Sequence, residues 1–247
     1  MPAKTGNTNQ TLMQKDPLGE ALIEYLKLGN DSNIVVHSDI SEDDIIPVSY
    51  LFREFDQMPE IEKRALSMCK GKTLDVGAGA GPHALWLQKN GINTTAIDTS
   101  QGAVKTMLER GVNDAENIDI KALKYRKYDT ILLLMNGIGI AGKLTYIPKF
   151  LKHLNSLLNE NGQVIIESTD IKYMFMEDDG SMWVDANKKY YGEVKYQMQY
   201  NDTKGEKFDW LFIDFNTLSD FAKKNGFKSE LIVEGENHEY IAQLIKI

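Results

Sequence analysis

Apolar residues recur at strand and helix spacings in alternation through the middle of the chain. Short apolar runs of strand length are followed by stretches in which apolar residues return every three or four positions. The predicted strands are residues 73–76, 94–97, 130–135 and 163–168, with a weaker one around Ile118. The predicted helices are residues 82–90, 101–110 and 146–158. Such repeated units predict a parallel sheet with helices on both faces, a doubly wound α/β fold.

Three helices are predicted before this alternation. Asp16 is a favourable N-cap, and Pro17 suits the first helical position. The segment 37–44 is acidic and turn-like. The two later helices are predicted within residues 45–55 and 59–69. We therefore expect residues 1–70 to form a helical segment that caps the sheet.

The pattern changes after residue 170. Alternating apolar and polar residues predict two strands, at 190–200 and 207–215, joined by a turn. A helix and two final strands are predicted after them. We expect a β-hairpin insertion at 171–215 and a main domain formed by 71–170 and 216–247. The aromatic residues of the insertion fit a half-buried sheet, with a lid over the substrate as the functional alternative.

A glycine-rich loop joins the first strand of the alternation to its helix. The sequence of residues 74–81 is L-D-V-G-A-G-A-G. Gly77 and Gly79 allow a tight turn and a close approach by a ligand, while Gly81 permits close packing of helix on strand. Because open parallel sheets bind ligands at the carboxyl ends of their strands, this loop is the predicted ligand site.

Two acidic residues indicate which ligand the loop binds. Asp75 would repel the pyrophosphate of a dinucleotide, and Pro82 stands where the dinucleotide motif requires its third glycine. S-adenosylmethionine has no phosphate and carries an ammonium and a sulfonium, which Asp75 would attract directly or through water. Asp98 ends the next strand, where a carboxylate can accept the ribose hydroxyls. A nicotinamide oxidoreductase is therefore disfavoured.

These motifs resemble those of the class I S-adenosylmethionine-dependent methyltransferases. D-V-G-A-G-A-G matches the first motif of that family and A-I-D-T-S its ribose motif, and the resemblance covers about residues 70–170 and the final strands. It implies a Rossmann-like sheet with an antiparallel last strand. It also implies that Asp119 and Ile120 flank the adenine, and that Met135, Asn136 and Gly137 line the methionine moiety and the methyl group.

Arg53 is a further candidate, because its planar fork could bind the cofactor carboxylate from the N-terminal segment. A surface pair with a nearby glutamate is the alternative. The full set of expected cofactor residues is Arg53, Asp75, Gly77, Ala78, Gly79, Asp98, Thr99, Asp119, Ile120, Met135, Asn136 and Gly137.

The sequence contains no obvious catalytic group. A sulfonium methyl is already activated, so an acceptor held in line can react by direct displacement without a dedicated base. Asn136 and His238 are the two catalytic candidates. The segment 136–139 is N-G-I-G and not N-P-P-Y, which argues against methylation of base or glutamine amino groups by that route.

The composition limits the kinds of substrate and metal site that are expected. The chain has 36 acidic and 28 basic side chains and a formal charge of −8, which disfavours nucleic acid as substrate. Cys69 is the single cysteine, which excludes an intramolecular disulfide and a multi-cysteine zinc site, and no metal is predicted. The polar N-terminus lacks signal-peptide character, and the longest apolar run is too short to span a bilayer, so cytoplasmic residence is expected.

Together these features predict an S-adenosylmethionine-dependent methyltransferase that acts on a small or medium-sized acceptor. The alternative is a non-catalytic module that binds or senses S-adenosylmethionine. The acceptor, the methylated atom and a possible homodimer stay open at this point.

Overall fold

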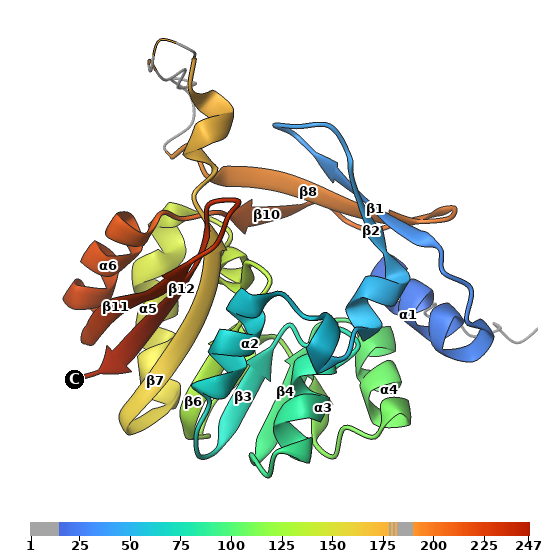
Figure 1. Ribbon diagram of the computed structural model, residues 1–247, viewed down its shortest axis with the longest axis horizontal. Coiled ribbons are helices and arrows are strands. Elements are labelled where there is room, and N and C mark those ends of the chain that lie inside the picture. Colours follow the sequence, from blue (N-terminus) through green and yellow to red (C-terminus); the bar gives the residue numbers. More distant parts are fainter. Residues whose placement is uncertain (1–14, 178, 180, 182–189) are drawn as a thin grey trace, which may run out of the picture.

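The computed structural model describes residues 15–177, 179, 181 and 190–247. The polar N-terminal residues 1–14 and part of the expected insertion, residues 178, 180 and 182–189, lie outside the described residues. Two sheets build the described part, with helices on both faces of the larger one (Figure 1). None of the described helices is long and apolar enough to cross a membrane.

The larger sheet has seven strands in the order β11-β12-β7-β6-β3-β4-β5. They are β3 (Thr73–Val76), β4 (Thr94–Asp98), β5 (Ala115–Asn117), β6 (Tyr128–Leu133), β7 (Leu158–Thr169), β11 (Phe227–Glu234) and β12 (Glu239–Lys246). Neighbours from β7 to β5 are parallel, while β12 runs antiparallel to β7 and to β11. The doubly wound sheet with an antiparallel last strand is thus confirmed. Its strand order reverses between β3 and β6, the position at which such sheets bind ligands.

Apolar side chains fix the helices on the faces of this sheet. The helices are α1 (Pro17–Leu28), α2 (Glu60–Ser67), α3 (Pro82–Lys89), α4 (Gln101–Arg110), α5 (Ile147–Leu157) and α6 (Phe215–Lys224). Ile61 of α2 and Leu87 of α3 pack with Ile165 of β7 on one face. Leu151 of α5 and Leu218 of α6 pack into the core on the other face. Both faces of the strands are therefore covered, as the continuous apolar runs predict.

Asp16 attaches α1 to the main domain. Its Oδ1 accepts from the backbone N–H of Gly19, which caps α1, and its Oδ2 accepts from the Ser100 hydroxyl and the Gly102 N–H at the start of α4. The two helices approach so closely that a Cβ on Gly102 would lie 2.4 Å from the Cα of Gly19. One carboxylate thus serves two helix N-termini, which carry partial positive charge.

The second sheet lies above the carboxyl ends of the larger sheet (Figure 1). Its strands are β1 (Asn33–Ser38), β2 (Asp44–Pro47), β8 (Glu193–Tyr200), β9 (Thr203–Lys204) and β10 (Phe208–Leu211). The path is β10-β8-β1-β2, with β9 paired to β8. All of these pairings are antiparallel. The hairpin predicted in the insertion is present, but its long strand β8 also pairs with β1 from the N-terminal segment.

The N-terminal segment is therefore not purely helical, which corrects the expectation for residues 1–70. It contains the β1–β2 hairpin, followed by two short 3₁₀ helices, η1 (Val48–Phe52) and η2 (Phe55–Gln57), in place of one longer helix. Ile34 and Val36 alternate inward and pack with Leu22 of α1 and Tyr200 of β8. Strand β1 was not predicted from the sequence, and its partner β8 lies far along the chain.

Candidate functional site

The glycine loop follows β3 and begins α3. Gly77, Gly79 and Gly81 have φ of 71°, 56° and 79°, a left-handed conformation that L side chains rarely adopt. A Cβ on Gly79 would meet no atom within 4 Å, and one on Gly77 would meet only the Ile140 side chain at 3.5 Å. At Gly81 it would meet Met107 and Val112 at 3.0 Å, so this glycine serves helix packing. The first two glycines thus leave open space beside the loop.

Asp98, at the end of β4, lies beside this loop. Its Oδ2 accepts from the Gly79 N–H at 2.9 Å, and its Oδ1 accepts from the Ser100 N–H at 2.8 Å. Burial raises the pKa of the carboxyl above its ordinary value, although these N–H groups act in the opposite direction. The next residue, Thr99, is exposed. The carboxylate is therefore held rigidly at the strand end and retains lone pairs for a ligand.

Asp75 is buried beneath the loop, and its Oδ2 has no hydrogen-bond partner among the described residues. Burial raises its pKa to about 6, with a smaller contribution in the same direction from the charge of Asp98. A buried carboxylate oxygen without a partner is costly, and it favours a site that a cationic group or an ordered water completes. The residues present therefore fit a ligand that carries an ammonium.

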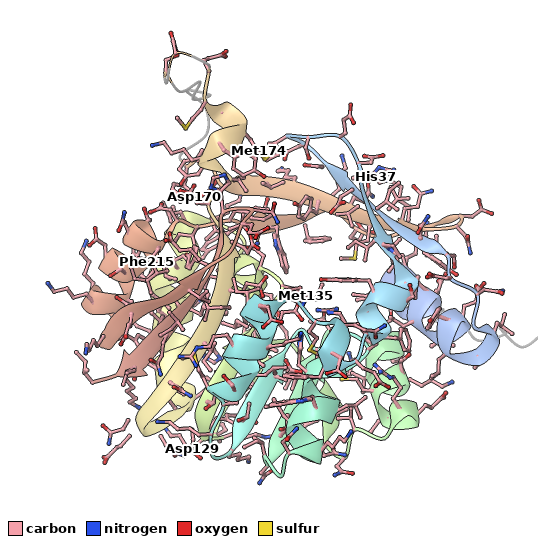
Figure 2. The ribbon with its side chains drawn as sticks, viewed as in Figure 1. His37, Asp129, Met135, Asp170, Met174 and Phe215 are labelled. Atoms are coloured by element: carbon pink, nitrogen blue, oxygen red, sulfur yellow. The ribbon has the colours of Figure 1, made fainter. Side chains whose placement is uncertain are left out.

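The segment after β6 lies on the other side of the loop. Met135 and Asn136 have φ of 53° and 55°, and Met135 is 37% exposed between the two sheets (Figure 2). Gly137 begins η4 (Gly137–Ala141) and is buried; a Cβ there would lie 3.0 Å from the Leu133 side chain. The turn thus exposes one side chain, Met135, toward the second sheet.

The Asn136 amide joins the two sheets. Its Oδ1 accepts from the Ser168 hydroxyl at 3.0 Å and from the Thr169 N–H at 3.3 Å, and its Nδ2 donates to the Leu211 carbonyl at 3.2 Å. Ser168 in turn accepts from the Ile213 N–H. These contacts give Asn136 a structural role at the base of the insertion, and they do not support its selection as a catalytic residue.

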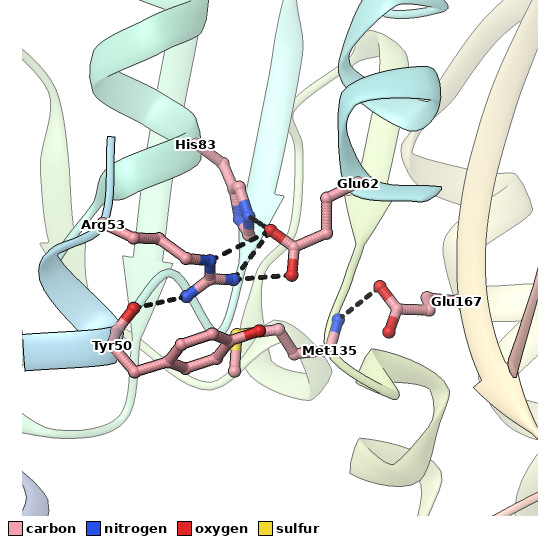
Figure 3. Close-up of polar contacts among 6 residues, drawn as sticks. All are labelled: Tyr50, Arg53, Glu62, His83, Met135 and Glu167. Carbon is pink, nitrogen blue, oxygen red and sulfur yellow. Dashed lines mark hydrogen bonds and ion pairs between the residues drawn. The ribbon is translucent and has the colours of Figure 1, made fainter. Parts of the chain in front are cut away.

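Arg53 is buried, with its fork on Glu62 rather than open to solvent (Figure 3). Its Nη2 lies 2.6 and 2.7 Å from the two Glu62 oxygens, and its Nη1 donates to the Tyr50 carbonyl at 2.8 Å. The guanidinium also stacks on the Tyr50 ring at 4.1 Å. His83 of α3 completes the cluster, with Nε2 3.0 Å from Glu62. Arg53 thus pairs with a glutamate, as the alternative held, but the pair is buried and not at the surface. Binding of the cofactor carboxylate by Arg53 stays a prediction.

Comparison with known proteins identifies the family of the chain. The profile of the family described as "Methyltransferase domain" matches residues 49–230. The fold is similar to that of a SAM-dependent methyltransferase from Bacteroides fragilis crystallised with S-adenosyl-L-homocysteine. That protein has 43% identity and a TM-score of 0.88, and the match covers 94% of this chain and 96% of the other. The chain belongs to the S-adenosylmethionine-dependent methyltransferases.

More distant methyltransferases share the fold alone. CcbJ from Streptomyces caelestis has 10% identity and a TM-score of 0.59, and the match covers 78% of this chain and 94% of the other. CalS10, an amino pentose methyltransferase from Micromonospora echinaspora, has 10% identity and a TM-score of 0.54, with 78% and 93% covered. Comparison with curated proteins gave no match. The protein is thus a methyltransferase enzyme that uses S-adenosylmethionine, with its acceptor unidentified.

The residues expected around the adenine are placed differently from one another. Asp119 is exposed after β5, and its Oδ1 accepts from the Lys121 N–H. Ile120 is only 2% exposed and packs in the main core, whereas Ile118, directly after β5, is half-buried. The adenine contacts of Asp119 and Ile120 stay a prediction.

His238 lies in the turn between β11 and β12. Because β12 is antiparallel to β7, this turn lies at the edge of the sheet where the parallel strands have their carboxyl ends. In the strand order it is separated from β6 and β3 by β7. The His238 ring stacks on Tyr173 at 4.7 Å, and its backbone has φ of 64°. A catalytic role for His238 stays a prediction that no contact supports. No group of three or more metal-binding side chains occurs among the described residues.

Glu167 is a residue of the site that the sequence did not indicate. It lies near the carboxyl end of β7, and its Oε2 accepts from the Met135 N–H at 2.9 Å (Figure 3). Burial raises its pKa to about 7. The available signal was one acidic residue in the apolar run V-I-I-E-S at the ligand edge of the sheet. Its contact with the Met135 N–H depends on the pairing of β6 with β7, which are separated by α5 in the sequence.

Proposed function

We propose that the methyltransferase binds S-adenosylmethionine across the carboxyl ends of β4, β3 and β6 and methylates a small molecule held beneath the second sheet. The adenosine would lie over β4 and β5, with its ribose on Asp98. The methionine end would lie over the glycine loop toward Met135. The observation that carries the proposal is the open space at Gly77 and Gly79 between two buried carboxylates, Asp75 and Asp98.

The charges support this orientation of the cofactor. The unpartnered Oδ2 of Asp75 suits the ammonium of the methionine end, directly or through a water. The rigid Asp98 carboxylate suits the two ribose hydroxyls, because an ionised carboxylate accepts hydrogen bonds with both oxygens. When bound, S-adenosylmethionine supplies the activated methyl group. The chain's own residues then have to hold an acceptor in line with it and exclude water.

The second sheet is the proposed acceptor cap. Tyr196, Phe208 and Trp210 share the face that is turned toward the larger sheet, and their rings are in edge contact. Trp210 lies directly on Gly139 of η4, where a Cβ would be 2.2 Å from the indole. An aromatic face over the methyl-transfer position favours a small acceptor over a nucleic acid, in agreement with the net charge of −8. Cytoplasmic residence stays a proposal, consistent with the single cysteine.

Calorimetric titration with S-adenosylmethionine and S-adenosylhomocysteine tests the cofactor site. We expect micromolar binding by the wild type and a loss of at least about 100-fold in Asp98→Ala, since each tenfold corresponds to about 1.4 kcal/mol. Asp220→Ala, an exposed carboxylate on α6, is the matched control and should bind normally. NAD is the control ligand. Equal affinity of Asp98→Ala and wild type would exclude the proposed ribose site.

A further inference from the structure

Among the described residues, only one of the two carboxylate oxygens of Glu167 has a hydrogen-bond partner. While Oε2 accepts from the Met135 N–H, Oε1 has no hydrogen bond within the described residues. The two basic side chains of the neighbouring cluster, Arg53 and His83, both contact Glu62, at 2.6 and 3.0 Å. Glu167 is half-buried, so it remains partly open to the space above β6 and β7. A partly desolvated carboxylate without its own cation favours a cationic or proton-donating partner.

The surroundings of Glu167 raise the pKa of its carboxyl to about 7, so the protonated and ionised forms are both present near neutral pH. Burial is the largest cause of its raised pKa of about 7; Glu62 raises the pKa further, and His83 and Arg53 lower it. Tyr50, which lies across Met135 from Glu167, also interacts with it electrostatically (Figure 3). A group of this pKa can both accept a proton and release it to solvent near neutral pH.

Glu167 and the aromatic face of the second sheet hold the two ends of one short segment. Glu167 binds the backbone of Met135, and Trp210 covers Gly139, four residues later. The family resemblance places the start of this segment, Met135 to Gly137, beside the transferred methyl group. An acceptor beside this segment would have the Glu167 carboxylate of β7 toward one end and Trp210 of β10 toward the other.

From this placement we propose that the acceptor is an alkyl amine with an apolar or aromatic body, and that Glu167 binds its nitrogen and takes its proton. The inference rests on the proposed function. Aromatic faces and a free carboxylate both attract an ammonium group. An aliphatic hydroxyl offers no charge to either and is too weak an acid to give its proton to a carboxylate.

The proposed transfer needs only the acceptor, Glu167 and S-adenosylmethionine. The ammonium gives one proton to the Glu167 carboxylate, and the freed nitrogen lone pair forms a bond to the sulfonium methyl carbon. The carbon–sulfur bond breaks, and its electron pair stays on sulfur, which leaves S-adenosylhomocysteine. The product is the N-methylated ammonium, and Glu167 then releases its proton to solvent. Glu167→Gln retains an acceptor for the Met135 N–H but cannot take the proton.

Paired probes with one carbon skeleton test this inference. Phenethylamine and 2-phenylethanol are each incubated with enzyme and S-adenosylmethionine, and S-adenosylhomocysteine release is measured with the wild type, Glu167→Gln and Glu230→Gln. Glu230 is an exposed residue of β11 and provides the matched control. We expect transfer to the amine alone, a loss of at least about 100-fold in kcat/KM for Glu167→Gln, and no change for Glu230→Gln.

The pH profile and cofactor binding separate the possible failures. The wild-type kcat/KM for the amine should include an ionisation near pH 7 that is missing from the Glu167→Gln profile. S-adenosylhomocysteine affinity, measured by calorimetry, should be equal in all three proteins. Transfer to the alcohol, no transfer to the amine, or unchanged kinetics in Glu167→Gln would overturn the inference while cofactor binding persists. Loss of cofactor binding in Glu167→Gln would place the residue in the cofactor site, and failure of the wild type to bind would overturn the proposed function itself.

Discussion

The two sheets meet at the site but are built from different kinds of pairing. In the larger sheet, Thr73 pairs with Thr94, and one helix connects the two strands. In the second sheet, Val35 pairs with Gln199, and most of the larger sheet lies between them in sequence. The proposed cofactor site lies on strands that are close together in sequence. The proposed acceptor site depends on the pairing of strands that are far apart in sequence. Cofactor binding and acceptor binding should therefore respond to separate substitutions.

The largest expected effect concerns Gly79, in the glycine loop of the proposed cofactor site. In Gly79→Ala the methyl group enters the open space beside the loop, and we expect the affinity for S-adenosylhomocysteine to fall by at least about 100-fold. Gly91→Ala is the matched control, because Gly91 also has a positive φ, of 78°, and nothing within 4 Å of its Cβ position, but it follows α3 at the opposite end of the helix. Both variants carry backbone strain of about 1–2 kcal/mol. Equal cofactor affinities in the two variants, measured by calorimetry, would remove the loop from the binding site.

A second effect concerns Asn136, whose side chain connects the two sheets. Asn136→Ala leaves the Ser168 hydroxyl and the Leu211 carbonyl without their partner and places alanine at a positive φ. We expect unfolding free energy to fall by about 2–4 kcal/mol in urea titration. Asn201→Ala shares the positive φ, of 48°, in an exposed turn after β8 and should lose only about 1 kcal/mol. If both variants lose the same amount, the Asn136 amide does not join the sheets.

The pH dependence of the free energy of unfolding should also depend on the charge state of Glu167. Its pKa is raised from 4.5 to about 7, so the folded protein binds this proton more tightly than the unfolded chain does. Ionisation therefore costs folding free energy, and the cost grows as pH rises from about 4.5 through 7. Glu167→Gln should be more stable than wild type at pH 8 by about 1–3 kcal/mol, with the advantage gone below pH 4.5. Glu230→Gln should show no such pH dependence in thermal unfolding, and a constant difference for Glu167→Gln across pH would contradict the shifted pKa.

The contrast between local and distant pairing also explains what the sequence predicted. The loop from Asp75 to Gly81 and the acid Asp98 were predictable because strand, turn and helix are contiguous, and each residue type has a conformational or charge reason. Glu167 was not predictable, because its role depends on a hydrogen bond from the Met135 backbone, which follows the neighbouring strand β6. The partner of Arg53 was uncertain for the same reason: any nearby glutamate satisfied the pattern, and only packing of α2 against α3 selected Glu62. Strand β1 was missed because its apolar face is completed by residues far along the chain, such as Tyr200 of β8.

The smallest expected effect concerns the exposed edge of the second sheet. His37 and Asp43 form a pair at 2.9 Å on the β1–β2 hairpin, with side chains 28% and 51% exposed. Because solvent screens such pairs, Asp43→Asn should change unfolding free energy by less than about 0.5 kcal/mol. Ile34→Val, which removes one buried methylene from the inward face of the same strand, should cost about 0.5–1.5 kcal/mol. A larger loss in Asp43→Asn than in Ile34→Val, measured in urea, would mean that ionic contacts at the hairpin rather than apolar packing against β8 and α1 hold this sheet over the site.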